Sequence, residues 1–324
     1  MPENGPNDPH PGGGFRVSSR HTGSMSRTGL GLHGIPRRLL APAVAAALVV
    51  ALTSCVVPPS SRDASPRSAT PPTSAGWVEY APALRGDLYL PRAGGRLGTI
   101  VLLHGGGFIT GSRAEIVAYA DPVMRQLDRG FAVLSIDYRL TTDSKNFFPA
   151  AVADASAAVD WVRNEGASYG APNDTVVLAG HSAGATIASL VAMGANAPGS
   201  PRGTTSAVDG WIGISGTYDL RGDGIAALQR AVWLGPGATP EAVDSASAVT
   251  LADAGDPPAY LVHGRHDGLV PLEQTQRLWV ALGAVGADPW IDVVGDAECD
   301  GHVPTCAINQ VFLDGWIDRV AARG

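Results

Sequence analysis

The sequence predicts an α/β domain with a mostly parallel central sheet and helices on both of its faces. From residue 77 onward, short apolar runs alternate with stretches of helical length, a pattern typical of βαβ units. The apolar runs are continuous, as expected for parallel strands that are buried on both faces. No internal repeat divides this region, so one domain over residues 77–324 accommodates all of these elements.

The predicted elements follow one another in a regular order. Strands are expected at Thr99–Leu103, Phe131–Tyr138, Thr175–Ala179, Gly210–Ile214, Ala259–His263 and Trp290–Val294. Helices are expected at 113–129, 149–166, 183–194, 271–286 and 307–322. The stretch between about 217 and 255 is modest in length, which indicates a small cap insertion between two strands.

The composition supports a folded domain and argues against nucleic acid as a partner. Hydrophobic residues make up 45% of the 324 residues, which is enough for one sizeable core. The formal net charge is −7, whereas binding to phosphates requires clustered Lys and Arg side chains.

The N-terminal segment has the features of an export signal. Arg37 and Arg38 precede the apolar run Leu39–Leu52, and small residues follow it. At about 14 residues this run is shorter than the roughly 20 residues of a membrane-spanning helix. A basic flank followed by a short apolar stretch is typical of a secretory signal peptide, so residues 1–54 are predicted to be removed from the mature protein.

The end of the apolar run suggests a lipid anchor. The segment Leu52-Thr53-Ser54-Cys55 resembles the lipobox of bacterial lipoproteins, which implies that Cys55 becomes the lipidated first residue of an exported protein on the outer face of the membrane. Residues 55–76 continue with many Pro, Ser and Thr residues, a composition typical of a linker. The alternative is a cleaved signal, an unmodified cysteine and a secreted protein.

Ser182 lies in a Gly-His-Ser-Ala-Gly segment between the predicted strand Thr175–Ala179 and an Ala-rich helix. In a G-x-S-x-G motif the serine lies on a sharp strand-to-helix turn, where a strained backbone requires small neighbours and the hydroxyl is presented above the sheet. A simple glycine-rich turn would have the same composition, so this motif alone leaves both interpretations open.

A second glycine-rich motif, His104-Gly105-Gly106-Gly107-Phe108, follows the predicted strand Thr99–Leu103. Acyl transfer develops negative charge on an oxygen of its tetrahedral intermediate, and backbone N–H groups that approach closely stabilise that charge. Glycine allows such an approach, although a flexible turn is the alternative for this stretch taken by itself.

Together the two motifs resemble the α/β-hydrolase esterases and lipases, in particular the carboxylesterase-like branch with an HGGG oxyanion motif. The resemblance covers residues 77–324 and implies a serine hydrolase that needs no cofactor. It also implies an oxyanion hole formed by the backbone N–H groups of Gly106, Gly107 and Ala183. The serine segment reads GHSAG and not the GDSAG of the hormone-sensitive-lipase branch, so the subfamily stays open.

A serine nucleophile on this fold needs an acid and a base, in the chain order Ser, Asp or Glu, His. His302 is predicted as the base, because it alone lies far downstream, between the last predicted strand and the last helix. The segment His263-Gly264-Arg265-His266-Asp267 follows another strand end and resembles the HGxxD of the family, which implies Asp267 as the acid. Carboxylates nearer to the base in sequence compete for this role: Asp292, Asp296, Glu298 and Asp300.

Two further sets of residues have alternative interpretations. His263, His266 and Asp267 could suggest a metal site, but no further ligand pattern accompanies them, and none is predicted. Cys299 and Cys306 bracket the predicted base in the segment CDGHVPTC. In an exported protein we expect them to form a disulfide that holds this loop, with two free thiols as the alternative.

The predicted function is hydrolysis of carboxylic esters through an acyl-enzyme intermediate on Ser182. Few residues separate Gly76 from His104, which leaves little room for an N-terminal helical cap and favours an open site for short acyl groups on small molecules or polysaccharides, including acetyl and feruloyl esters. An amide-cleaving hydrolase of the arylformamidase or peptidase type would use the same residues. A non-catalytic surface lipoprotein that binds a ligand is a second alternative.

Overall fold

The computed structural model of the chain contains one eight-stranded sheet with the order β1-β2-β4-β3-β5-β6-β7-β8. The structure describes residues 76–91, 96–142, 145–194, 208–295, 299 and 301–323. Strands from β3 to β8 are parallel, and only β1 and β2 at one edge are antiparallel to their neighbours. The strands are β1 Gly76–Ala81, β2 Leu84–Tyr89, β3 Gly98–Leu103, β4 Phe131–Ile136, β5 Val176–His181, β6 Gly210–Ile214, β7 Ala259–Gly264 and β8 Pro289–Val294.

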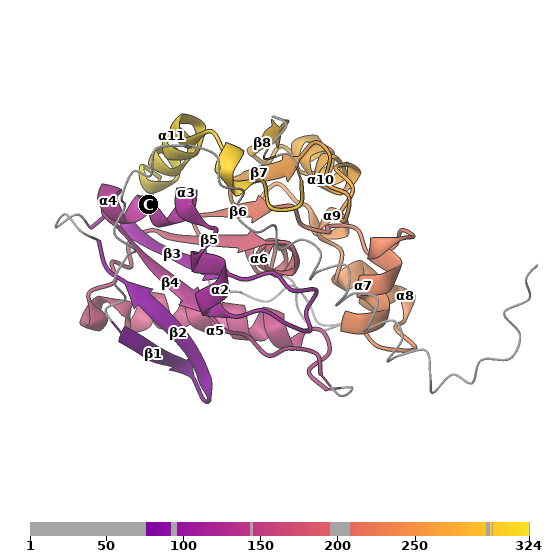
Figure 1. Ribbon diagram of the computed structural model, residues 1–324, viewed down its shortest axis with the longest axis horizontal. Helices are drawn as coiled ribbons and strands as arrows, with labels where there is room; N and C mark the ends of the chain where they lie inside the picture. The colour runs from indigo at the N-terminus through magenta and orange to yellow at the C-terminus, as the bar shows by residue number, and fades with distance from the viewer. Residues whose placement is uncertain are drawn as a thin grey trace, which may run out of the picture.

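Alternate residues of the central strands pack into two separate hydrophobic cores, one on each face of the sheet. On β3, Val101 and Leu103 belong to one core, whereas Ile100 and Leu102 belong to the other. The first core is covered by α5 (Ala150–Asn164), α6 (Ala183–Ala192) and α10 (Glu273–Ala284) (Figure 1). The second is covered by α2 (Arg113–Val117), α3 (Asp121–Met124), α4 (Gln126–Arg129) and α11 (Gln310–Ala321). The predicted parallel sheet between two helical layers is therefore confirmed.

The cap insertion joins β6 to β7 and contains three helices, α7 (Ile225–Trp233), α8 (Pro240–Ser245) and α9 (Ala248–Leu251). In Figure 1 these helices lie beyond the end of the sheet at which β5 and β6 finish. The side chain of Trp233 anchors the insertion, because its ring stacks on Phe108 with the centroids 4.1 Å apart and meets the edge of Phe148. All three elements are short, as expected from the modest length of this stretch.

Several predicted boundaries differ from the structure for identifiable reasons. The helix expected at 113–129 is three short helices. The first cannot continue into the second because Pro122, in the first turn of the second, has no backbone N–H to donate. The helix expected at 307–322 begins only at Gln310, where the Asn309 side chain accepts hydrogen bonds from two backbone N–H groups as its N-cap. Short 3₁₀ helices lie at Gly166–Tyr169 (η2) and Pro304–Ala307 (η3).

The antiparallel pair β1 and β2 was not among the predicted strands. These strands lie at the edge of the sheet and alternate between exposed and buried residues, so their apolar content is too low to form a continuous run. The predicted signal segment, Cys55 and the linker up to residue 75 lie outside the described residues. Within the described residues, no helix has the length and hydropathy that crossing a membrane requires.

Candidate active site

Three strand ends bring the predicted serine, histidine and aspartate together. Ser182 follows β5, Asp267 follows β7 and His302 follows β8, and these parallel strands all end at the same edge of the sheet. The Ser182 hydroxyl Oγ lies 3.0 Å from Nε2 of His302, and Nδ1 of His302 lies 2.8 Å from Oδ2 of Asp267. His302 thus donates its Nδ1–H to the carboxylate and presents a bare Nε2 to the serine hydroxyl, which is the tautomer required of a general base.

The backbone of Ser182 has an unusual conformation, with φ +54° and ψ −119°. Non-glycine residues rarely adopt a positive φ, and such strain is concentrated at functional sites. The conformation is held from both sides, because the Ser182 N–H donates to the carbonyl of Ile214 at 2.8 Å and its carbonyl accepts from the N–H groups of Ala185 and Thr186 at the start of α6. In this conformation the hydroxyl reaches the imidazole of His302.

Two glycines of the serine motif allow this turn to form. A Cβ atom on Gly180 would lie 2.3 Å from the backbone of Gly184, and one on Gly184 would lie 2.4 Å from the carbonyl oxygen of Leu103 at the end of β3. Both distances are below any normal contact with backbone atoms. The G-x-S-x-G spacing is thus explained by contact between the two glycines and between the helix start and β3.

The glycine loop after β3 lies directly against Ser182. A Cβ atom on Gly105 would lie 3.1 Å from the Ser182 Cβ, so only glycine permits this approach. Gly106 and Gly107 both have a positive φ, and the carbonyl of Gly106 accepts from two N–H groups farther along the loop. The main chain of His104 is fixed in turn by the hydroxyl of Tyr138, which donates to its carbonyl at 2.8 Å.

The side chain of Asp267 is buried, and both of its carboxylate oxygens are hydrogen-bonded. Oδ1 accepts from the backbone N–H groups of Leu269 and Val270 at 2.8 and 2.9 Å, while Oδ2 accepts from His302 and from Nε2 of His263 at 3.3 Å. Burial by itself raises the pKa of Asp267, but the hydrogen bonds from His263 and His302 outweigh it and hold this pKa well below the usual range. The carboxylate is therefore ionised over the whole working range of a histidine base.

Two histidines without a predicted catalytic role contact this assembly. His263 is fully buried between Thr275, whose hydroxyl lies 2.7 Å from its Nδ1, and the Val270 carbonyl, 2.8 Å from its Nε2. The Nε2–H of His263 therefore donates to the Val270 carbonyl, and Oδ2 of Asp267 is a second, longer contact of the same nitrogen at 3.3 Å. His181 contacts the main chain of His302. The HGxxD segment pointed to His263, but nothing in the sequence around His181 indicated its partner 121 residues away.

The other carboxylates that competed for the acid role do not join the three residues. Asp292 accepts from the Tyr260 hydroxyl at 3.1 Å and from the Asn309 backbone at 3.3 Å, on the side of the sheet where α11 packs. Asp296, Glu298 and Asp300 lie outside the described residues. Across the described ranges, no group of three or more His, Cys, Asp or Glu side chains is placed to hold a metal ion.

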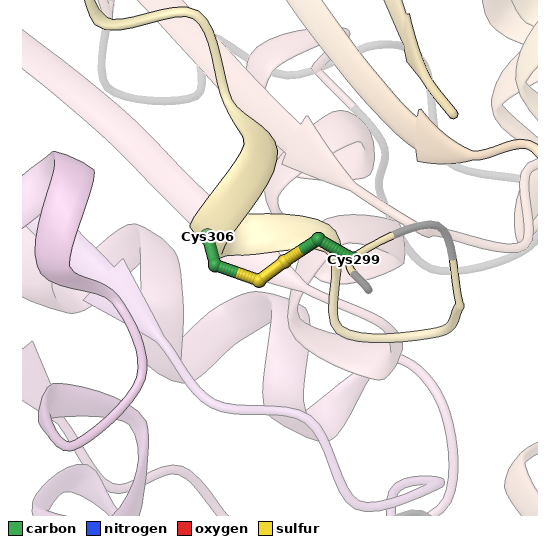
Figure 2. Close-up of a disulfide and its surroundings, with 2 residues drawn as sticks. All are labelled: Cys299 and Cys306. Atoms are coloured by element: carbon green, nitrogen blue, oxygen red, sulfur yellow. A yellow bond between two sulfur atoms is a disulfide. The ribbon is translucent and has the colours of Figure 1, made fainter. Parts of the chain in front are cut away.

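The predicted pairing of Cys299 with Cys306 is present as a disulfide, with the two Cα atoms 6.0 Å apart. It links the segment after β8 to the 3₁₀ helix η3 (Figure 2). In the sequence, His302 lies between the two cysteines. Closing so short a loop is worth about 2–3 kcal/mol on the chain-entropy model. The disulfide therefore restricts the segment that carries His302.

The fold and this arrangement of side chains define an α/β-hydrolase. The BD-FAE family model matches residues 86–282, and the chain belongs to that family. Among characterised sequences, the chain is 30% identical over 237 residues to Esterase LipC of Mycobacterium tuberculosis, covering 65% of this chain and 58% of that protein. It is 30% identical over 199 residues to Probable carboxylic ester hydrolase LipM of the same organism, covering 58% and 45%. The chain thus spans about half the length of the curated relatives it matches.

Solved structures share the fold at lower sequence identity. A truncated carbohydrate esterase from gut microbiota superposes with a TM-score of 0.66 at 24% identity, covering 77% of this chain and 96% of the other. The butyrate-bound esterase Est2 of Thermogutta terrifontis gives a TM-score of 0.62 at 22% identity, covering 76% and 94%. Nearly the whole of each of these proteins is therefore represented in this chain.

The strained turn predicts an unusual order of stabilities. Because glycine tolerates a positive φ and alanine does not, Ser182→Gly should be more stable than Ser182→Ala by about 1 kcal/mol in urea unfolding. The matched control is Ser189, which is buried within helix α6. There the order should reverse, with the glycine variant less stable by about 1 kcal/mol. A less stable glycine variant at position 182 would contradict the proposed strain.

The depressed pKa of Asp267 predicts how stability depends on pH. Its folded pKa lies below the unfolded value of about 3.9, so its contribution is complete above that value and is lost as the pH falls toward the folded pKa. Urea unfolding between pH 3 and 7 should therefore show a steeper loss of stability at low pH in the wild type than in Asp267→Asn. The same variant should lose roughly 10⁴-fold in kcat, since it no longer selects the His302 tautomer. Equal pH slopes in the two proteins would contradict this assignment.

Proposed function

We propose that this protein is a carboxylic ester hydrolase that acts through a covalent acyl-enzyme on Ser182, with His302 as base and Asp267 as its orienting acid. The observation that carries the proposal is the continuous hydrogen-bonded chain from the Ser182 hydroxyl through His302 to Asp267. The names of the relatives LipC and LipM support the choice of ester hydrolysis among acyl transfers.

In the first half of the reaction, the Ser182 Oγ attacks the carbonyl carbon of the ester while Nε2 of His302 takes the hydroxyl proton. The resulting oxyanion is stabilised by the backbone N–H groups of Gly106, Gly107 and Ala183, the last of which lies at the positive end of helix α6. The C–O bond to the alcohol then breaks as the protonated His302 gives that proton to the departing oxygen.

In the second half, a water molecule replaces the alcohol. His302 takes a proton from the water as its oxygen attacks the acyl carbon, and the same N–H groups stabilise the second oxyanion. Breakdown of this intermediate returns the proton to the Ser182 Oγ and releases the carboxylic acid. Asp267 remains ionised throughout and stabilises the imidazolium form of His302 in both halves.

A short acyl group is the proposed substrate preference. The cap insertion is small, and the stack of Trp233 on Phe108 fastens it to the residue that follows the oxyanion glycines. This fixed contact limits how far the insertion can withdraw to admit a long chain. The butyrate-bound Est2 and the carbohydrate esterase among the structural relatives support short acyl groups, carried either on small molecules or on polysaccharides.

Export with a lipid anchor at Cys55 is part of the proposal. The Cys299–Cys306 disulfide supports it, because disulfides persist in oxidising compartments outside the cytosol.

A chain-length series of nitrophenyl esters tests the proposed reaction. We expect kcat/KM to be highest between acetyl and butyryl esters and to fall at least roughly tenfold at octanoyl, because added methylenes that do not fit reduce transition-state binding. Ser182→Ala should reduce kcat by roughly 10⁴-fold or more. Nitroanilides of the same acids, run alongside, should be cleaved far more slowly. Preference for the anilides, activity confined to long chains, or activity that survives Ser182→Ala would each contradict part of the proposal.

Fractionation of bacterial cells that express the full chain tests the anchor. The wild type should enter the detergent phase, whereas Cys55→Ala should not, because a covalent lipid supplies the membrane affinity. Mass spectrometry of non-reduced peptides from the same membrane fraction should recover Cys299 joined to Cys306. A wild type found only in the medium would indicate secretion, and an unpaired Cys299 in exported protein would contradict the disulfide.

A further inference from the structure

His181, the residue immediately before the nucleophile, contacts the loop that carries the base. Its Nε2 lies 2.8 Å from the main-chain carbonyl oxygen of His302. Because a carbonyl oxygen can only accept, Nε2 of His181 carries the hydrogen and donates it. The two imidazole rings also pack together, with their centroids 4.9 Å apart. The strand end that presents Ser182 thus holds the backbone of its own general base.

The opposite side of the His181 ring is held as well. Nδ1 lies 3.4 Å from the hydroxyl of Tyr119, whose ring meets the imidazole edge-on at 5.4 Å. Gly105 of the oxyanion loop approaches so closely that a Cβ there would lie 2.9 Å from Nδ1. With only 5% of its surface exposed, the ring has little room to rotate. Its donor therefore points at the His302 carbonyl in a fixed direction.

The charge state of His181 is also fixed. Burial, followed by the nearby charge of His302, lowers the pKa of His181 to about 3, although the hydrogen bond to the His302 carbonyl and the charge of Asp267 act in the opposite direction. The ring is thus neutral wherever His302 can act as a base. It keeps one donor at Nε2 across that range and does not compete with His302 for the serine proton.

The imidazole ring of His302 forms two hydrogen bonds, one with Asp267 and one with Ser182. Its Nδ1–H must reach Asp267 while its Nε2 stays within reach of Ser182, and both contacts depend on where the main chain places the Cβ atom. The disulfide restricts the two ends of this segment, but neither cysteine is next to His302 in the sequence. The hydrogen bond from His181 acts on the His302 peptide group itself.

We propose that His181 is a positioning residue whose Nε2–H fixes the main chain of His302, so that the imidazole keeps its contacts with Ser182 and Asp267 together. This inference rests on the proposed function, because it assigns His181 a role through the base of that reaction. This role of the histidine in the GHSAG segment is separate from that of the two glycines, which must be small because of close backbone contacts.

A matched pair of substitutions tests this role in the full-length protein. Gln places a side-chain N–H donor at nearly the same reach as the imidazole Nε2, whereas Leu fills the space without a donor. With a butyryl nitrophenyl ester, His181→Leu should lower kcat by roughly 10- to 100-fold, the effect of a small misplacement of a catalytic group. KM should stay within about twofold, because ground-state binding is not the target. His181→Gln should recover most of kcat, and Tyr119→Phe, which leaves Nε2–H in place, should stay within about threefold of the wild type.

A second readout reports the geometry of the base without substrate. The low-field proton NMR resonance of the His302 Nδ1–H bonded to Asp267 should be present in the wild type and His181→Gln, and lost or broadened in His181→Leu. Thermal unfolding establishes that each variant is folded. If His181→Leu does not fold, His181→Gln decides: near-wild-type kcat supports the role, and a tenfold or greater loss in the folded protein overturns it.

Two results for a folded His181→Leu would overturn the inference: wild-type kcat together with an intact resonance, or a loss equal to that of His181→Gln with a raised KM, which would indicate packing alone. A different result would contradict the proposed function. If the wild type shows no turnover that depends on Ser182, the reaction assignment is wrong, whereas the NMR comparison still decides whether His181 positions His302.

Discussion

The contact between the Gly184 backbone and the end of β3 fixes the positions of the segments that meet around Ser182 at this edge of the sheet. Because a Cβ on Gly184 would lie 2.4 Å from the Leu103 carbonyl oxygen, the start of α6 can pack this closely only with glycine at that position. This packing places Ser182 in its strained conformation and brings the glycine loop after β3 against the serine Cβ. Ser182 and the predicted oxyanion donors are therefore positioned by one backbone contact between the start of α6 and the end of β3.

Three histidines near this contact hold the hydrogen-bonded chain from Ser182 to Asp267 in place. His302 bridges Ser182 and Asp267, His263 contacts the same Asp267 oxygen from within the core, and His181 bonds to the main chain of His302. Only His302 combines a free acceptor nitrogen with contact to the serine hydroxyl. The other two are buried with both ring nitrogens engaged, so their donors are fixed in direction.

Motifs that depend on local backbone geometry could be predicted from the sequence, and contacts between distant segments could not. The serine and oxyanion segments require glycine at set positions because of close backbone approaches, so their spacing is visible in the chain. Parallel strands within a sheet leave continuous apolar runs, which is why the strands from β3 to β8 were predicted. The partner of His181 depends instead on how the loop after β8 folds back over β5. The edge strands β1 and β2 were missed because alternating exposure gives them no apolar run.

Rapid-quench mass spectrometry with a nitrophenyl butyrate tests the central claim most directly, because it observes the acyl-enzyme itself. The account predicts that one butyryl group per chain accumulates before steady state, on the peptide that contains Ser182, and that it disappears as turnover completes. Turnover without any acylated peptide, or a butyryl group on a different residue, would contradict the account.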